Sequence, residues 1–209
     1  MRFSGKCLLS IVVLLGCMML PNLALADNTT DFSNNGGTLT GSSAGLSLTG
    51  STLIAVTGYQ NLGIVTGDLG SVGFTTGALT SGSLQMGGTF ASGGTFAIDG
   101  NGTGGLPDGV IFSGSFSGPV TWTLTTLANG THNYTLTGVV TGMMGGSSVS
   151  GVTVQLTINT GKGYFNGSTT ISGGDTSMST SVPEPSTLAL FGAGIIGLGG
   201  TLRKKTLKQ

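Results

Sequence analysis

Few side chains in this sequence have the chemistry that catalysis needs. His132 is the only histidine and Glu184 is the only glutamate. A Ser-His-Asp relay would have to join His132 to a distant aspartate and one of many serines, and the sequence contains no nucleophile-elbow motif. We interpret His132 as a polar surface residue of the turn between Asn129 and Asn133. The sequence therefore predicts a protein that is not an enzyme.

The segment from Asp99 to Asp108 has some of the oxygen ligands of a calcium loop. Asp99 and Asn101 take the first and third positions of an EF-hand-like pattern, and a glycine takes the sixth. The twelfth position is Val110 instead of glutamate, and neither flank has a helical pattern. We interpret the segment as an Asx and glycine turn, and a calcium site at Asp99, Asn101 and Asp108 is the alternative. No other metal or cofactor is expected.

Charge is scarce and unevenly placed. Charged residues make up 7% of the 209 residues. Between Asp27 and Val182 there is one cation, Lys162, against six aspartates, which gives this stretch a net charge of −5. Phosphate recognition needs clustered lysine and arginine, so a nucleic-acid partner is excluded. Both cysteines, Cys7 and Cys17, precede residue 27, so disulfides and thiolate sites are not expected in the exported protein.

The body alternates apolar and polar residues with the period of β-strands. The clearest run is 151–159, where four aliphatic residues share one face. Segments 120–127 and 131–140 predict a hairpin, and so do 151–159 and 168–171. Further short strands are expected at 46–50, 53–58, 70–76, 79–86, 88–98 and 110–116. Many short strands without a helical period predict an all-β fold, an antiparallel β-sandwich or barrel-like domain.

The predicted hairpin at 120–140 has one apolar and one threonine-rich face. Trp122 and Tyr134 are placed at the centre of the core. The pairs Thr121 with Thr123, and Thr135 with Thr137, face outward as a candidate flat surface for ice or a glycan. The general preference of threonine for strands explains the same pattern.

The N-terminus has the layout of a secretory signal peptide. Basic residues precede an apolar run at 8–20, and Ala24 and Ala26 form a small-x-small cleavage site. We expect cleavage before Asp27. Residues 14–17 resemble the lipobox of bacterial lipoproteins, which would make Cys17 the first, lipidated residue; this alternative stays open.

The C-terminus has the layout of a short membrane anchor. Residues 187–202 contain no charge, and as a helix they would be about 24 Å long, slightly less than a hydrocarbon core of about 30 Å. The basic residues Arg203, Lys204 and Lys205 follow directly and are expected to stay on the cytoplasmic side. A core helix is the alternative. The sequence predicts a membrane helix at about 187–202 and a basic tail at 203–208.

Two prolines hold the chain extended and accessible just before this apolar segment. The residues are Val182, Pro183, Glu184, Pro185 and Ser186. Together with the apolar segment and the basic cluster, this ending resembles the PEP-CTERM sorting signal of Gram-negative bacteria. The resemblance covers only about the last 28 residues. It implies recognition and processing by exosortase, a membrane-embedded protease, and a setting in which the cell makes exopolysaccharide.

These observations predict four segments: a signal peptide at 1–26, a secreted Gly/Thr-rich β domain at 27–176, a linker at 177–181 and the sorting signal at 182–209. The expected function is that of an exported structural protein of the cell surface or extracellular matrix, associated with a biofilm or exopolysaccharide. It would be anchored transiently in the inner membrane by its C-terminal helix and processed by exosortase. The alternative is a secreted carbohydrate- or calcium-binding module.

Overall fold

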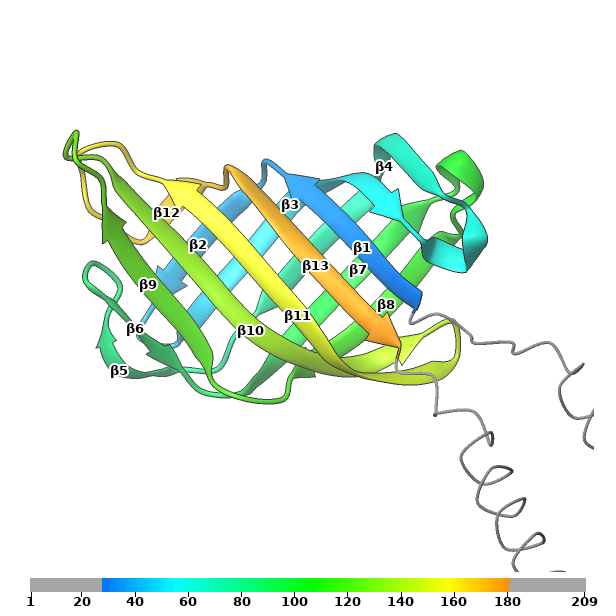
Figure 1. The fold of residues 1–209 in the computed structure, drawn as a ribbon. Helices are drawn as coiled ribbons and strands as arrows, with labels where there is room; N and C mark the ends of the chain where they lie inside the picture. Colours follow the sequence, from blue (N-terminus) through cyan, green and yellow to red (C-terminus); the bar gives the residue numbers. More distant parts are fainter. Residues whose placement is uncertain (1–27, 181–209) are drawn as a thin grey trace, which may run out of the picture. The chain divides into compact units, whose positions relative to one another are not determined.

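The computed structural model describes residues 28–180, and 71% of this segment lies in β-strands (Figure 1). The strands are β1 (Asn28–Asn35), β2 (Thr38–Ser42), β3 (Gly45–Thr57), β4 (Ile64–Thr75), β5 (Leu79–Ser83), β6 (Gly87–Phe90), β7 (Gly93–Asn101), β8 (Asp108–Phe116), β9 (Val120–Thr126), β10 (His132–Met144), β11 (Ser147–Asn159), β12 (Ser168–Thr170) and β13 (Gly173–Thr180). Two short 3-10 turns occur at Tyr59–Asn61 and Thr103–Gly105. Within 28–180, no helix has the length and apolar character needed to cross a membrane.

Eight of these strands close into an antiparallel barrel. Their order is β11, β13, β1, β3, β4, β7, β8 and β10, and pairing of β10 with β11 completes the ring. Figure 1 shows β13 lying between β11 and β1. Of the two architectures predicted from the sequence, the barrel is confirmed and the two-sheet sandwich is not.

Two long strands of the barrel change neighbours along their length. Strand β10 pairs with β9 through residues 132–137 and with β8 through residues 140–144. Strand β3 pairs with β2 through 45–49 and with β1 through 52–57. The remaining strands therefore extend the sheet beyond the ring, with β9, β6 and β5 continuing from β10 and with β2 and β12 continuing from β3.

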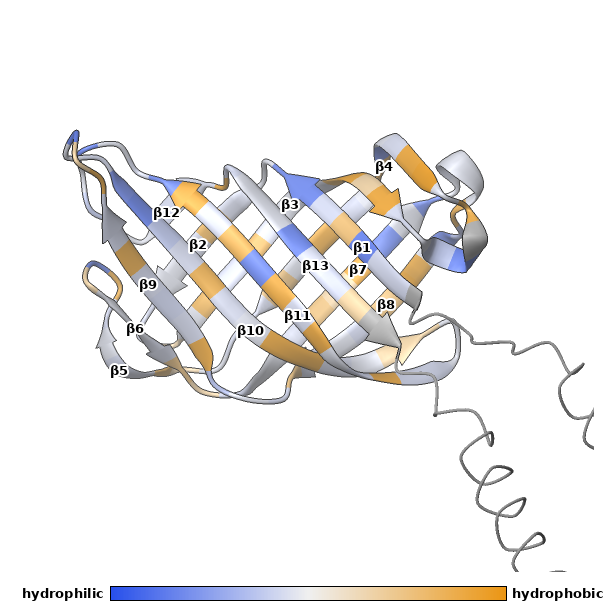
Figure 2. Ribbon diagram, in the orientation of Figure 1, coloured by the Kyte–Doolittle hydropathy of each residue, from blue (hydrophilic) through white to orange (hydrophobic). Residues whose placement is uncertain are grey.

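The core follows from the alternation of side chains. Along β10, Tyr134, Leu136 and Val140 are fully buried, whereas Thr135, Thr137 and Val139 lie on the opposite, outward side of the strand. Figure 2 shows the same alternation of hydrophobic and hydrophilic residues along β11. The Trp122 and Tyr134 rings stack with their centroids 4.9 Å apart, so the predicted position of both residues in the core is confirmed.

The polar atoms of these two rings are satisfied inside the core. Trp122 Nε1 donates to the Leu84 carbonyl at 2.9 Å, and the Tyr134 hydroxyl donates to the Gln85 carbonyl at 2.6 Å. The same hydroxyl accepts a hydrogen bond from the Phe165 backbone N–H at 3.0 Å. Because buried polar groups need partners, these bonds fix the 84–85 turn and the loop at 165 over one end of the core.

Glycine has a packing role inside the barrel. Gly138 faces inward between Leu136 and Val140, where a Cβ would lie 2.7 Å from the Phe116 ring. Phe116 packs edge-on against Phe74 and Phe96, with ring centroids 5.9 Å and 6.1 Å apart. The cluster of aromatic rings therefore has room for Phe116 only because Gly138, on the neighbouring strand β10, has no side chain.

Several predictions about the strands need correction, and residues 88–98, expected as one run, belong to two strands, β6 and β7. Residues 46–50 and 53–58 lie largely in one continuous strand, β3. The predicted hairpin between 151–159 and 168–171 is wrong, because β11 pairs with β10 and β13 whereas β12 pairs with β2. Residues 177–180, expected in a linker, form the second half of β13, where Met178 is fully buried.

Candidate binding face and its hollow

The outer face of five neighbouring strands carries polar side chains in register. One row crosses β9, β10, β11, β13 and β1, and its members are Thr121, Thr137, Gln155, Asp175 and Ser33. A second row contains Thr123, Thr135 and Thr157. Neighbouring strands lie about 4.8 Å apart, so the first row is about 19 Å long. We call these eight side chains the polar face.

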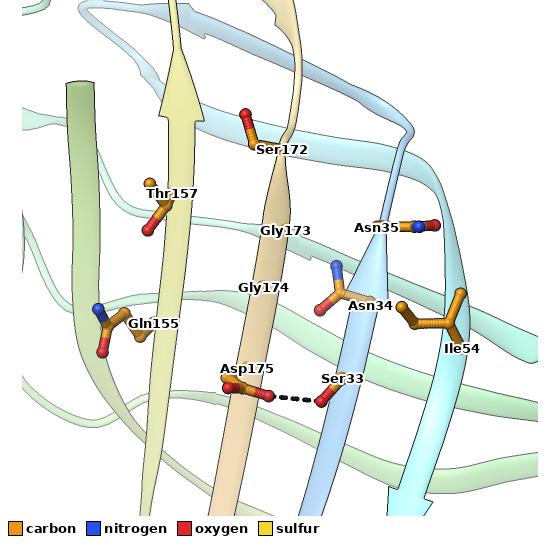
Figure 3. A pocket seen from close by; sticks show the side chains of 10 residues that line it. All are labelled: Ser33, Asn34, Asn35, Ile54, Gln155, Thr157, Ser172, Gly173, Gly174 and Asp175. Atoms are coloured by element: carbon orange, nitrogen blue, oxygen red, sulfur yellow. Dashed lines mark hydrogen bonds between the residues drawn. The ribbon is translucent and has the colours of Figure 1, made fainter. Parts of the chain in front are cut away.

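A hollow of about 500 Å³ lies in this face where β11, β13 and β1 run side by side (Figure 3). It is lined by Ser33, Asn34, Asn35, Ile54, Gln155, Thr157, Ser172, Gly173, Gly174 and Asp175. Figure 3 shows the side chains of β11 and β1 flanking the bare stretch of β13 at the two glycines. The hollow is a gap in the outer layer of side chains and is separate from the filled interior of the barrel.

The two adjacent glycines of the hollow have different surroundings. At Gly173, an added Cβ would meet only the Asn34 backbone carbonyl, at 3.8 Å, which is ordinary contact. At Gly174, an added Cβ would lie 2.6 Å from Asn34 Oδ1. Gly174 is therefore required by packing, whereas Gly173 leaves open a space that a side chain would fit.

Asn34 forms part of the base of the hollow. It follows a register shift in β1, its exposed fraction is 4%, and its Nδ2 donates to Ser51 Oγ at 2.7 Å. Ser51, also fully buried, donates in turn to the Asn35 carbonyl at 3.0 Å. This chain of hydrogen bonds fixes the Asn34 amide beneath Gly174.

Asp175 is the only ionisable residue among the ten that line the hollow. Its Oδ1 accepts a hydrogen bond from Ser33 Oγ at 2.7 Å, and Gln155 faces it across β11 and β13. A carboxylate has about four acceptor positions, so Asp175 retains acceptors for a ligand. The hollow thus offers hydroxyl and amide donors and acceptors next to one anionic group.

The calcium candidates Asp99, Asn101 and Asp108 lie on β7 and β8. Asn101 is opposite Asp108 in register, but Asp99 is opposite Val110. Asn101 Oδ1 accepts from the Thr103 backbone N–H at 3.0 Å, which is the Asx turn that the sequence indicates. Asn101 Nδ2 donates to the Asp68 carbonyl at 3.0 Å. In the described segment 28–180, no three His, Cys, Asp or Glu side chains are grouped so that they could hold a metal ion.

His132 is not the surface residue that the sequence suggests. It is the first residue of β10 and shares the inward face with Tyr134, so its exposed fraction is only 7%. Its ring stacks on Tyr164 with centroids 4.3 Å apart, and its Nδ1 lies 3.2 Å from the Gly163 carbonyl. His132 therefore helps to hold the 160–164 loop.

The residues predicted for export and sorting lie outside the described residues. They are Ala24, Ala26, Val182, Pro183, Glu184, Pro185, Ser186, Arg203, Lys204 and Lys205. Residues 181–204 match the PEP-CTERM protein-sorting motif. The PEP-CTERM motif indicates an exported protein that exosortase handles at the membrane. No curated protein and no solved structure matched the chain.

The hollow itself was not predicted from the sequence, in contrast to the PEP-CTERM motif. Its lining comes from β1, β3, β11 and β13, which are up to about 140 residues apart, as for Ser33 and Asp175. The only local signal was the glycine pair at 173–174 inside an otherwise Ser/Thr-rich strand, because glycine in a strand often marks a close approach or an unfilled site.

Proposed function

We propose that this protein is an exported structural component of the cell surface or extracellular matrix. The PEP-CTERM motif at residues 181–204 is the observation that carries the proposal. In this account the C-terminal segment is a temporary membrane anchor and an address, and exosortase processes it near Pro183 to Pro185. The final location is then the cell surface or an exopolysaccharide matrix.

The described domain has properties that suit such a role. Its first and last strands pair with each other, with Asn28 opposite Thr180, so the barrel is closed by its own termini. The sorting motif begins at residue 181, directly after β13 ends. The domain contains no cysteine, so its folding needs no disulfide formation after export.

The proposed role is non-catalytic. The single histidine, His132, stacks on Tyr164 and lies next to the Gly163 carbonyl, so packing of the loop explains its presence without a catalytic role. The aspartates of the described residues each lie on a different strand: Asp31 on β1, Asp68 on β4, Asp99 on β7, Asp108 on β8 and Asp175 on β13. A structural role therefore explains the polar, sparsely charged surface with fewer assumptions than a catalytic role does.

The experiment compares the location of three chains in the native host, with and without its exosortase. The full chain is expected at the surface or in the medium when exosortase is present, and in the inner membrane when it is absent. A chain lacking 182–209 is expected to be exported in soluble form in both strains. Gln209→Ala, outside the matched residues, is the control and should behave as the full chain. An identical distribution of the full chain in both strains would contradict the proposal.

A further inference from the structure

The hollow around Gly173 is a concave feature of the polar face, and we propose that it binds a sugar unit of a neutral oligosaccharide. The neighbouring units of the ligand then lie along the row Thr121, Thr137 and Gln155. This inference goes beyond sorting and does not depend on it.

The size of the hollow fits a small ligand. Its volume of about 500 Å³ is within the range of about 300–1,000 Å³ found for ligand sites. Gly173 exposes the backbone of β13 at its floor, and Ile54 supplies an apolar side chain at one edge. A ring with polar substituents around its rim and C–H groups on its faces matches this lining.

The lining matches the hydrogen-bonding properties of sugar hydroxyls. A hydroxyl both donates and accepts, so it needs acceptors and donors close together. Asp175 accepts, Gln155 and Asn35 carry amides that do both, and Ser33, Thr157 and Ser172 carry hydroxyls. These groups come from three neighbouring strands and surround the bare glycine backbone.

Charge selects a neutral ligand over an anionic one. The stretch between Asp27 and Val182 has a net charge of −5, and its one lysine, Lys162, does not line the hollow. Asp175 lies within the hollow, so a uronate or sulfated sugar would be repelled at contact distance. Hydroxyl-rich neutral sugars have no such penalty.

None of the ten lining residues is aromatic, so recognition rests on hydrogen bonds that compete with water. Binding of a single sugar unit is therefore weak, and a longer chain binds better because it also contacts the threonines of β9 and β10. Affinity should rise with the length of the oligosaccharide.

The test is saturation-transfer NMR and titration of the full chain in detergent micelles. The neutral probes are cellohexaose and mannohexaose, and the anionic probe is the hexamer of galacturonic acid. We expect transfer to at least one neutral hexamer, weaker transfer to its disaccharide and none to the galacturonate hexamer. Transfer to neither neutral hexamer, or preference for the anionic hexamer, would overturn the proposal.

Two variants locate the site. Gly173→Val fills the hollow, and because a Cβ at Gly173 makes only ordinary contact, the barrel should stay folded. Gly118→Val, at a loop glycine with nothing within 4 Å of its added Cβ, is the matched control. Gly173→Val should abolish transfer and Gly118→Val should preserve it.

Asp175→Ala should weaken binding by about tenfold, because a hydrogen bond to a charged group is lost. Unchanged binding in both Gly173→Val and Asp175→Ala would show that the sugar binds elsewhere and would overturn the assignment of the site. The location of Gly173→Val in the native host is measured as well. If this variant loses sugar binding but is still sorted correctly, the binding site and the proposed export are independent of each other.

Discussion

At the scale of single residues, the hollow results from two neighbouring glycines with different roles. Gly174 faces inward over Asn34, whose amide is held by Ser51, while Gly173 faces outward into open space. The sequence shows the two residues as an identical pair. Their difference is visible only once β1 and β13 are placed side by side, because the contact that distinguishes them joins residues 34 and 174.

We predict that Gly174→Ala and Gly173→Ala differ in stability. Gly174→Ala forces the Asn34 amide away from Ser51 and should lower the free energy of unfolding by about 1–3 kcal/mol. Gly173→Ala should be neutral or should raise it by up to about 1 kcal/mol, because alanine reduces the entropy of the unfolded chain. Urea denaturation of the two variants measures both values. Equal losses in the two variants would contradict the packing described for Asn34.

At the scale of strands, the sequence predicted those elements whose alternation is strict. Strands β9 and β10, their connecting turn and the inward positions of Trp122 and Tyr134 follow from period-two patterns. Strand β13 was not predicted from the sequence. Its inward positions after Gly174 are Thr176 and Met178, and they lie in a Ser/Thr-rich stretch that resembles a linker. Its burial depends on pairing with β1 and β11, which composition does not reveal.

This correction to β13 can be tested with two adjacent substitutions. Met178 is fully buried, so Met178→Asp places an unpaired charge in the core and should cost at least about 3 kcal/mol of stability. Ser177→Asn, an uncharged substitution on the outward side of the same strand, where residue 177 lies opposite Asp31, should change stability by about 0.5 kcal/mol or less. Thermal unfolding of the full chain in detergent distinguishes them. If residues 177–180 were a linker, both variants would melt like the parent chain.

At the scale of the whole molecule, barrel closure could not be predicted from the sequence. Closure requires β1 to pair with β13 and β10 to pair with both β8 and β11, and these contacts join distant segments. Patterning gave the strands and the antiparallel class, but a sandwich and a barrel use the same alternation. The sorting motif, by contrast, is a continuous stretch of sequence, so it was recognised without any structure.

In the proposed function, the PEP-CTERM motif determines where the barrel is delivered. Mass spectrometry of the mature termini, on protein isolated from the native host, tests this claim most directly. We expect an N-terminus at Asp27 and a new C-terminus near Pro183 to Pro185. In a strain without exosortase, the C-terminus should instead be Gln209. A surface protein that keeps Gln209 while exosortase is active would contradict this claim.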